Sequence, residues 1–437
     1  MAEQTKVTTL EKVVIRFSGD SGDGMQLTGT IFSNLSAIFG NEISTFPDYP
    51  AEVRAPQGTL SGVSGFQVHL GSRKIFTPGD KADVLVAMNP AALKVNVKHI
   101  KPNAIVIIDT DSFKKSDLDK ALYTTDDPFK ELGLNSVQVV AAPISTMVKD
   151  GLAEFGLDNK SALRSKNMFA LGLVCWLFDR PLEEAMNMLQ NKFAKKPVIA
   201  QANIKALTDG YNYGHNIHAS VSTYRIESKK AEPGFYTDVN GNKATSYGLI
   251  AAAEKAGLQL FLGSYPITPA TDILHELSKR KDLGVITVQA EDEIAGICTA
   301  IGGSFAGCLA ATSTSGPGLA LKSEAIGLAV IAELPLVIID VQRGGPSTGM
   351  PTKSEQTDLM QALYGRNGES PLVVIAASTP TDCFDAAYWA GKLAVEHMTP
   401  VILMTDAFIA NGSSAWRLPD LDNYPEIKPN YVSNYQG

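Results

Sequence analysis

The chain has 437 residues, of which 44% are hydrophobic and 19% are charged. Such a chain is globular and long enough for two or three domains, each with its own core. The net charge of -8 provides no basic footprint for nucleic acid or for an anionic membrane surface. The N-terminus is polar, and the apolar stretch 327–341 is broken by Glu333 and Pro335, so we expect a cytoplasmic protein without a membrane span.

The first part of the chain alternates apolar runs with helical stretches. It opens with the β-branched run 13–17, followed by a glycine-rich turn and a helical stretch to about Phe39. Further strand candidates are 66–70, 83–88, 104–109 and 137–142, and helical periodicity follows over 167–178 and 182–193. Buried runs separated by helices favour a parallel sheet in an α/β domain.

Within this part, the segment Gly19-Asp20-Ser21-Gly22-Asp23-Gly24 follows a strand and opens a helix. Glycines in this position let backbone N–H groups approach a phosphate at the helix N-terminus. Asp20 and Asp23, however, bring negative charge to the same place. A tight turn with acidic capping of the helix explains the segment equally well.

The alternation lapses between about Arg225 and Lys243. Residues 227–234 are polar and rich in turn formers, and Asn240-Gly241-Asn242 is another turn signal. The sequence therefore predicts an N-terminal domain over 1–225 and an interdomain linker over 226–242.

A second block, over 243–418, alternates more regularly. Its strand candidates are 258–262, 285–289, 308–312, 336–341, 372–376 and 401–404. The expected fold class is therefore α/β with two doubly wound domains, whose ligands lie at the carboxyl ends of strands. The conspicuous motifs of the second block lie at such ends, over 264–269, 289–293, 313–318 and 342–352.

Glu291-Asp292-Glu293 begins a helix directly after the strand 285–289. Acidic residues are common at helix starts because of the helix dipole alone. The functional interpretation is that thiamine cofactors need a carboxylate against the aminopyrimidine ring for proton removal. Small residues behind Glu293, including Gly302 and Gly307, would let such a helix pack closely on its neighbour. Glu293 fits this register better than Glu291.

Two loops complete the candidate site. Residues 264–269 read S-Y-P-I-T-P, which on its own is a loop with two prolines. Residues 342–352 combine Arg343 with several hydroxyls and flexible glycines, which suits a bidentate grip on a carboxylate. A lone loop arginine is usually solvated, but its position at a strand end gives the binding role about even weight.

The four cysteines, Cys175, Cys298, Cys308 and Cys383, form no C-x-x-C pair and lie in apolar or small-residue runs. We interpret them as core residues, with neither a zinc site nor an iron–sulfur cluster. The histidines, including the neighbouring pair His215 and His218, form no catalytic motif and are assigned to structure.

In this order, the motifs G-S-Y-P-I-T-P-A-T-D, Q-A-E-D-E-I-A-G, S-T-S-G-P-G and R-G-G-P-S-T-G-M-P-T resemble the pyrimidine-binding domain of 2-oxoacid:ferredoxin oxidoreductases. G-D-S-G-D-G-M-Q and F-P-D-Y-P-A-E-V-R-A-P resemble that family's gamma domain. The arrangement is similar to an alpha subunit with a fused gamma domain, most like the 2-oxoglutarate enzyme. Residues 419–437 are then expected to begin a linker to a C-terminal domain that this sequence lacks.

The resemblance implies oxidative decarboxylation of a 2-oxoacid, with electrons passed to ferredoxin and the acyl group passed to coenzyme A. It implies thiamine diphosphate shared with a beta subunit, magnesium and a 4Fe–4S cluster on that partner, and an alpha–beta heterotetramer. The family's metal motif begins with G-D-G and needs a later asparagine, which is missing from residues 46–52, so no metal site is predicted on this chain.

By the same resemblance, Glu293 is the catalytic residue. Substrate binding is implied for Thr268, Arg343, Thr348 and Thr352. Cofactor binding is implied for Tyr265, Pro266, Ile267, Glu293, Ser315 and Gly316. Lys353 is a weak candidate for a distal carboxylate. Pyruvate or another 2-oxoacid is an alternative substrate, and a non-catalytic assembly subunit is a further alternative.

Overall fold

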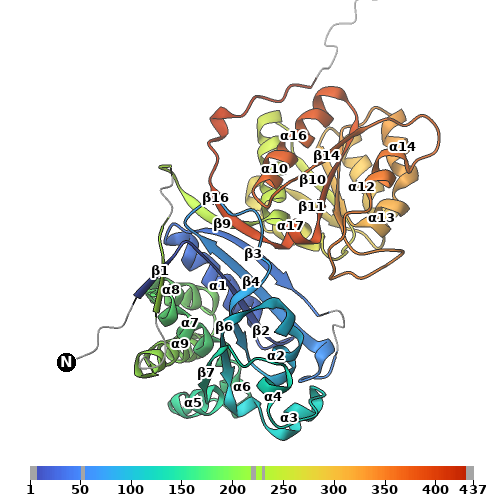
Figure 1. The fold of residues 1–437 in the computed structure, drawn as a ribbon. Coiled ribbons are helices and arrows are strands. Elements are labelled where there is room, and N and C mark those ends of the chain that lie inside the picture. Colours follow the sequence, from blue (N-terminus) through green and yellow to red (C-terminus); the bar gives the residue numbers. More distant parts are fainter. Residues whose placement is uncertain (1–6, 51–54, 218–222, 229–231, 430–437) are drawn as a thin grey trace, which may run out of the picture. The chain divides into compact units, whose positions relative to one another are not determined.

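The computed structural model describes residues 7–50, 55–217, 223–228 and 232–429 (Figure 1). The chain forms two compact units, Met1–Asp238 and Val239–Gly437, so the boundary falls within the segment expected to be a linker. His218 and part of the F-P-D-Y-P-A-E-V-R-A-P motif, residues 51–54, lie outside the described residues. Among the described helices, none combines the length and apolar character of a membrane-crossing segment.

The first unit is built on a mixed sheet. Six of its strands lie in the order β7-β6-β5-β2-β4-β3. Their bounds are β2 (Lys12–Asp20), β3 (Glu42–Asp48), β4 (Val63–Gly71), β5 (Ala82–Ala87), β6 (Ile100–Asp109) and β7 (Gln138–Ala142). Strands β2, β5, β6 and β7 are parallel, as expected, whereas β4 is antiparallel to both β2 and β3. An antiparallel pair needs no α-helical crossover, and the described part of the β3–β4 connection contains only a short 3-10 helix, Leu60–Gly62.

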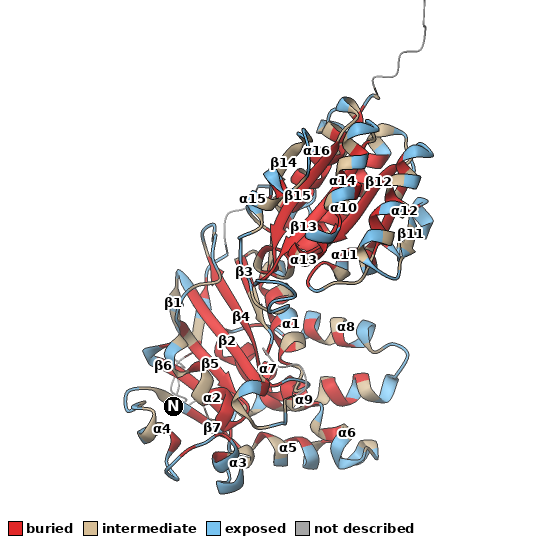
Figure 2. Ribbon diagram, turned by 90° about the vertical axis from the view of Figure 1, so that its right-hand side faces the viewer, coloured by how far each residue is buried: buried red, intermediate tan, exposed pale blue. Residues whose placement is uncertain are grey.

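Helices flank this sheet. Strands β1 (Val7–Leu10) and β8 (Thr223–Ile226) are parallel to each other and form a separate two-stranded sheet. The helices are α1 (Met25–Ile38), α2 (Pro90–Asn96), α3 (Lys115–Lys120), α4 (Pro128–Glu131), α5 (Ile144–Gly151), α6 (Asn159–Leu163), α7 (Lys166–Leu177), α8 (Glu183–Lys192) and α9 (Pro197–Ile217). Helices α7 and α8 confirm the periodicity seen in the sequence. Helix α7 is almost wholly buried (Figure 2).

The second unit contains the doubly wound sheet that the sequence predicts. Its strands are β10 (Leu260–Ser264), β11 (Ile286–Gln289), β12 (Leu309–Thr314), β13 (Leu336–Gln342), β14 (Val373–Ala376) and β15 (Pro400–Asp406). They are all parallel, in the order β11-β10-β12-β13-β15-β14. The order reverses at β10, whose neighbours β11 and β12 both follow it in the chain. Such a reversal is the topological switch point at which doubly wound folds bind ligands.

Helices cover both faces of this second sheet, and a separate apolar cluster fills each side. They are α10 (Gly241–Ala256), α11 (Thr271–Leu277), α12 (Glu293–Phe305), α13 (Gly316–Leu321), α14 (Ser323–Ile331), α15 (Leu359–Tyr364), α16 (Asp382–His397) and α17 (Ala407–Asn411). In the chain, strand β9 (Tyr236–Asn240) precedes α10 and strand β16 (Ser413–Arg417) follows α17. Asn240, read from the sequence as part of a turn, instead caps α10 by accepting a hydrogen bond from the Lys243 N–H at 2.9 Å.

Two details of the second unit differ from expectation. The segment after Pro419, expected to be a linker, packs on the unit, because Ile427 is only 2% exposed and the Tyr424 hydroxyl donates to Asp385. The core role expected of the cysteines is wrong for Cys298, which is exposed on α12, although Cys175 and Cys383 are buried.

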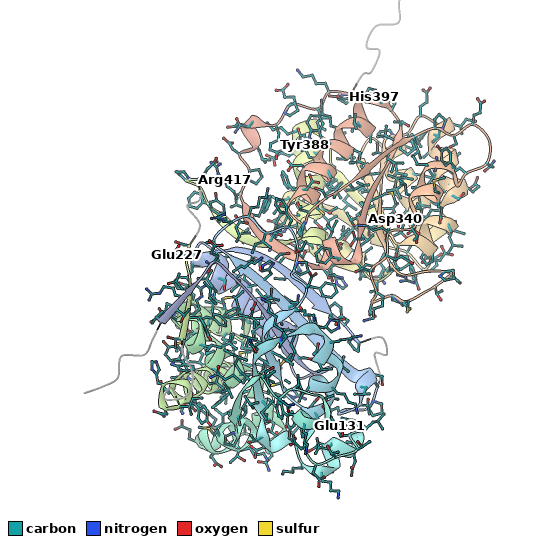
Figure 3. The ribbon with its side chains drawn as sticks, viewed as in Figure 1. Glu131, Glu227, Asp340, Tyr388, His397 and Arg417 are labelled. Carbon is teal, nitrogen blue, oxygen red and sulfur yellow. The ribbon has the colours of Figure 1, made fainter. Side chains whose placement is uncertain are left out.

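Asp340 lies on the central strand β13 and has no exposed surface (Figure 3). Burial raises the pKa of its carboxyl well above the usual range, and the neighbouring Asp358 carboxylate adds to the rise. Two carboxylates can satisfy each other only by sharing a proton. Asp340 therefore keeps its proton to a higher pH in the folded chain than in the unfolded chain.

This linkage predicts the behaviour of Asp340→Asn. A carboxyl whose pKa is higher in the folded chain than in the unfolded chain stabilises the fold at pH values below the unfolded pKa. That contribution is lost as pH rises toward the folded pKa. The stability of Asp340→Asn relative to wild type should therefore increase between about pH 4 and pH 7, by at most about 1.4 kcal/mol per pH unit. Urea unfolding across this range measures the difference.

The control for this experiment is Asp282→Asn, because Asp282 is an exposed residue of the same unit. The rise with pH expected for Asp340→Asn should not appear in this control. A pH-independent effect of Asp340→Asn would contradict the shared-proton interpretation.

Candidate functional site

Most of the residues singled out from the sequence gather at the carboxyl ends of three strands in the second unit. The loop after β10 carries Tyr265, Pro266, Ile267 and Thr268, the segment after β12 carries Ser315 and Gly316, and Arg343 follows β13. Glu293 begins the helix that follows β11. The strand order thus converges these segments on the switch point at β10.

Helix α12 lies unusually close to β10. A Cβ on Gly263 would meet Thr299 Oγ1 at 2.2 Å and the Gly296 carbonyl oxygen at 2.7 Å, and one on Gly303 would meet the Phe261 ring at 2.8 Å. Close packing through small residues was expected, but the expectation named Gly302 and Gly307, whereas Gly296 and Gly303 make the contact. A Cβ on Gly302 or Gly307 would meet no atom within 4 Å, and Gly307 is needed instead for its left-handed backbone, with a φ of 92°.

Glu293 is the first residue of α12, and Asp292 caps the helix by accepting a hydrogen bond from the Ala295 N–H at 2.7 Å. The Glu293 side chain is half-buried against α13, since a Cβ on Gly318 would lie 2.8 Å from its Cγ. Within the described part of the chain, its carboxylate accepts no hydrogen bond. Glu291, by contrast, is exposed.

Arg343 joins two of the predicted loops. Its Nη1 donates to the Thr268 carbonyl oxygen and its Nη2 to the Thr348 carbonyl oxygen, both at 2.7 Å. Only 7% of Arg343 is exposed, and its Nε has no partner among the described residues. Burial lowers the pKa of Arg343, while the Glu293 charge acts in the opposite direction. Arg343 thus lies within electrostatic reach of Glu293.

The loop after Arg343 folds back on itself. The Gly344 N–H donates to the Lys353 carbonyl at 2.7 Å, and the Met350 N–H donates to the Gly344 carbonyl at 2.8 Å. Gly349 has a φ of 56°, and a Cβ there would lie 1.9 Å from the Gly344 oxygen, so a side chain is excluded. Thr348 is exposed and Thr352 is half-buried.

A cavity of about 400 Å³ lies beside this loop. Gly316, Arg343 and Asp358 are among its lining residues, but Glu293 and Thr268 are not. Ser315 is fully buried, and its hydroxyl has no partner among the described residues. Tyr265, Pro266 and Ile267 are all half-buried, and Ile267 also packs against the apolar core of the unit.

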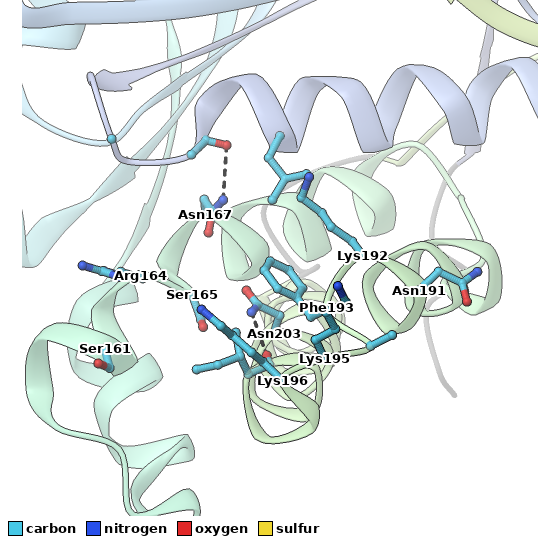
Figure 4. A pocket seen from close by; sticks show the side chains of 15 residues that line it. Ser161, Arg164, Ser165, Asn167, Asn191, Lys192, Phe193, Lys195, Lys196 and Asn203 are labelled. Atoms are coloured by element: carbon cyan, nitrogen blue, oxygen red, sulfur yellow. Dashed lines mark hydrogen bonds between the residues drawn. The ribbon is translucent and has the colours of Figure 1, made fainter. Parts of the chain in front are cut away.

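A larger cavity, of about 600 Å³, lies in the first unit and was not predicted (Figure 4). It lies among the N-terminus of α1, the start of α7 and the turn between α8 and α9. Four cationic side chains line it, from Arg164, Lys192, Lys195 and Lys196. The run K-F-A-K-K at 192–196 was the available sequence signal, but nothing in the sequence placed it near Gly24.

The glycine-rich loop 19–24 borders this cavity through Gly22 and Gly24. Both of its aspartates have partners: Asp20 accepts from the Gly58 N–H at 3.0 Å, and Asp23 pairs with Lys166 at 3.2 Å. Helix α1 begins after Gly24 without a side-chain cap, so acidic capping is wrong. Its first N–H groups remain available to an anion.

Asn167 adds a polar group to the same cavity. Its Nδ2 donates to the Gly24 carbonyl at 3.2 Å, and its Oδ1 has no partner among the described residues although Asn167 is only 3% exposed (Figure 4).

As for metals, no group of three or more His, Cys, Asp or Glu residues in the described ranges is arranged to hold an ion.

Two family models match the chain. Residues 14–213 match "Pyruvate ferredoxin/flavodoxin oxidoreductase", and residues 251–436 match "Pyruvate flavodoxin/ferredoxin oxidoreductase, thiamine diP-bdg". The first match lies within the first unit and the second within the second unit.

Individual relatives agree with these matches. The chain is 53% identical to the 2-oxoglutarate oxidoreductase subunit KorA of Mycobacterium tuberculosis over 97% of its own length and 65% of that protein. It is 42% identical to the 2-oxoglutarate synthase subunit KorA of Archaeoglobus fulgidus over 44% of its own length and 56% of that protein. The chain therefore spans about two thirds or less of the length of these relatives.

A solved structure is also similar over nearly the whole chain. It is the 2-oxoglutarate:ferredoxin oxidoreductase from Magnetococcus marinus with 2-oxoglutarate, coenzyme A and succinyl-CoA bound. The TM-score is 0.82 at 32% identity, and the match covers 98% of this chain and 69% of that one. The chain belongs to the 2-oxoacid:ferredoxin oxidoreductase family, as an alpha subunit with a fused gamma domain.

Proposed function

We propose that the chain acts, together with a beta subunit, as a 2-oxoglutarate:ferredoxin oxidoreductase in the cytoplasm. The reaction is the oxidative decarboxylation of 2-oxoglutarate with coenzyme A, giving succinyl-CoA and carbon dioxide, with electrons passed to ferredoxin. One observation carries the proposal: Glu293 begins α12 at the switch point of the sheet, with a carboxylate that accepts no hydrogen bond from the described residues.

Thiamine diphosphate supplies the electron sink that lets a 2-oxoacid lose carbon dioxide. Glu293 suits the pyrimidine half of this cofactor, because its free carboxylate can hold or release a proton at a ring nitrogen. The unpartnered Ser315 hydroxyl and the backbone at Gly316 add polar contacts, and Tyr265, Pro266 and Ile267 form an adjacent wall. The magnesium diphosphate half and a 4Fe–4S cluster are assigned to the beta subunit.

For the substrate, the proposal uses Thr268, Arg343, Thr348 and Thr352. Arg343 is nearly buried and already donates to two backbone carbonyls, so it is rigidly oriented. Two of its five N–H donors are used, and the second hydrogens of Nη1 and Nη2 remain for a carboxylate oxygen, whereas the unpartnered Nε is itself buried. Lys353, at the far end of the same loop, is the candidate for the distal carboxylate.

We assign the coenzyme A phosphates to the cavity of the first unit. Four cationic side chains, the uncapped N-terminus of α1 and the unpartnered Asn167 Oδ1 all border that cavity. Cations and helix N–H groups complement phosphate, and an amide oxygen can accept a hydrogen bond from an adenine amino group. The relative from Magnetococcus marinus binds coenzyme A.

We assign the beta subunit to an apolar face formed by α12 and α14, which pack side by side. Phe305 and Ile331 are each 83% exposed on these helices, and Ile294 and Leu328 are 48% and 47% exposed. Large apolar side chains gathered on one surface are typical of an interaction site. Because α12 begins at Glu293, a partner on this face would border the catalytic carboxylate.

The first test concerns catalysis. Glu293→Gln should keep the fold but lose turnover by roughly 10²–10⁴-fold, because it removes acid–base help at the cofactor. The measurement is 2-oxoglutarate-dependent reduction of methyl viologen after reconstitution with the beta subunit. Glu291→Gln is the matched control and should retain activity.

The outcomes of this assay separate the alternatives. Loss with Glu291→Gln but not with Glu293→Gln would mean that the neighbouring acid is catalytic. Faster turnover of pyruvate or a branched 2-oxoacid than of 2-oxoglutarate would show that the substrate is that other 2-oxoacid. No turnover of any 2-oxoacid would favour a non-catalytic assembly subunit.

The second test concerns coenzyme A. The double reversal Lys195→Glu with Lys196→Glu should weaken coenzyme A binding at least about tenfold, because each charged contact contributes about 1.5–3 kcal/mol. Calorimetry on the full chain measures the affinity. The control is Lys114→Glu with Lys115→Glu, near α3, which should not change it. Equal weakening by both pairs would indicate a general charge effect and contradict the site.

The third test concerns the partner. The chain alone should bind thiamine diphosphate weakly even with magnesium, because it is assigned only the pyrimidine half of the site. Addition of the beta subunit should restore binding, brown colour and turnover together. Tight magnesium-dependent binding by the isolated chain, measured by calorimetry, would contradict the shared site.

The same experiment tests the assigned face. Ile331→Asp should abolish association with the beta subunit, as measured by size-exclusion chromatography, because it brings a charge into an apolar interface. Leu418→Asp is the control, since Leu418 is 48% exposed but lies outside the face. Normal association of Ile331→Asp with the beta subunit would show that the interface does not include the face formed by α12 and α14.

A further inference from the structure

Lys322 is a lysine without exposed surface. It separates α13 from α14 in the second unit and is among the largest fully buried side chains of the chain. Lysines are rarely buried, because an ammonium that leaves water needs a compensating partner. Lys322 was not among the residues singled out from the sequence.

The Lys322 ammonium reaches the first turn of α12. Its Nζ donates to the backbone carbonyl oxygen of Glu293 at 2.5 Å, which is its one hydrogen bond within the described residues. An ammonium has three donors, so a single carbonyl leaves it poorly compensated. The charge remains directed at the start of the catalytic helix.

Among the ionisable groups that act on Lys322, the Glu293 carboxylate has the largest effect. Three groups of α12 act on it, the carboxylates of Glu293 and Asp292 and the thiol of Cys298. The Asp292 carboxylate is already used to cap the helix. Arg343, from the loop after β13, also lies within electrostatic reach of Glu293.

Burial outweighs these carboxylates and lowers the pKa of Lys322 to about 8. A protonated lysine with a lowered pKa destabilises the fold at neutral pH, whereas an apolar side chain of similar length would not. Residues that cost stability are typical of functional sites, where activity and stability compete.

We propose that Lys322 is a positioning residue for Glu293, which holds the first turn of α12 and keeps a fixed positive charge beside the catalytic carboxylate. This inference rests on the proposed function. The Nζ hydrogen bond holds the Glu293 backbone, and with it the direction in which the carboxylate leaves the first turn of α12. The charge is present near neutral pH and is lost as the lysine titrates.

The first experiment measures the chain without turnover. Because the folded pKa of Lys322 lies below the unfolded value, wild-type stability should gain a contribution as pH rises from about 8 to about 10.5. In Lys322→Met this contribution should be missing, and the variant should be at least as stable as wild type at pH 7. Urea midpoints at several pH values give the comparison. Lys279→Met, at a lysine whose side chain is 66% exposed, should keep the wild-type dependence.

The second experiment uses the enzyme assembled with the beta subunit. Lys322→Met should lower kcat by roughly 10–10²-fold with little change in KM, because the first turn of α12 loses the hydrogen bond that holds the Glu293 backbone. Lys322→Arg keeps a charged donor at this position and should restore most of the wild-type kcat. Thiamine diphosphate binding should be retained in both variants.

Three results would overturn the inference. One is a wild-type kcat in Lys322→Met, and another is an alkaline stability contribution that survives in that variant. The third is failure of both Lys322→Met and Lys322→Arg to fold, which would make the lysine structural. These results differ from failure of the proposed function, in which Glu293→Gln itself would retain full turnover.

Discussion

The contact between α12 and β10 is the constraint on which the candidate site depends. At Gly263 the strand meets the helix backbone so closely that a methyl group would overlap Thr299 and the Gly296 carbonyl. This approach brings the N-terminus of α12 to the carboxyl end of the sheet, where a helix start offers a capped and polar environment. Glu293 gains its position from backbone packing, and Lys322 and Arg343 lie within electrostatic reach of it.

Much of the second unit could be predicted from the sequence. Its six central strands are short apolar runs separated by helices, and such runs have few alternatives to a buried parallel strand. The position of Glu293 followed from the same pattern, because a helix after a strand begins at the edge where ligands bind. The register of the small residues was missed, since Gly296, Gly302, Gly303 and Gly307 all recur at helical spacing and the sequence does not say which face meets β10.

Other features depend on contacts between residues far apart in the chain. Asp340 and Lys322 each lie in an apolar run, and only their neighbours Asp358 and Glu293 give them a role. The two aspartates of the loop 19–24 look like obstacles to an anion until their contacts with Gly58 and Lys166 are known. In the first unit the order of strands was equally hidden, because an antiparallel β4 has the same apolar pattern as a parallel one.

The apolar face on α12 and α14 also bears on how the subunit behaves in solution. Phe305 and Ile331 expose most of their surface, so copies of the chain attract one another wherever these faces meet. The net charge of -8 opposes this attraction through long-range repulsion. Salt shortens the range of the repulsion to about 8 Å at physiological ionic strength but leaves the apolar attraction intact. We therefore expect the colloidal stability of the subunit to fall as ionic strength rises.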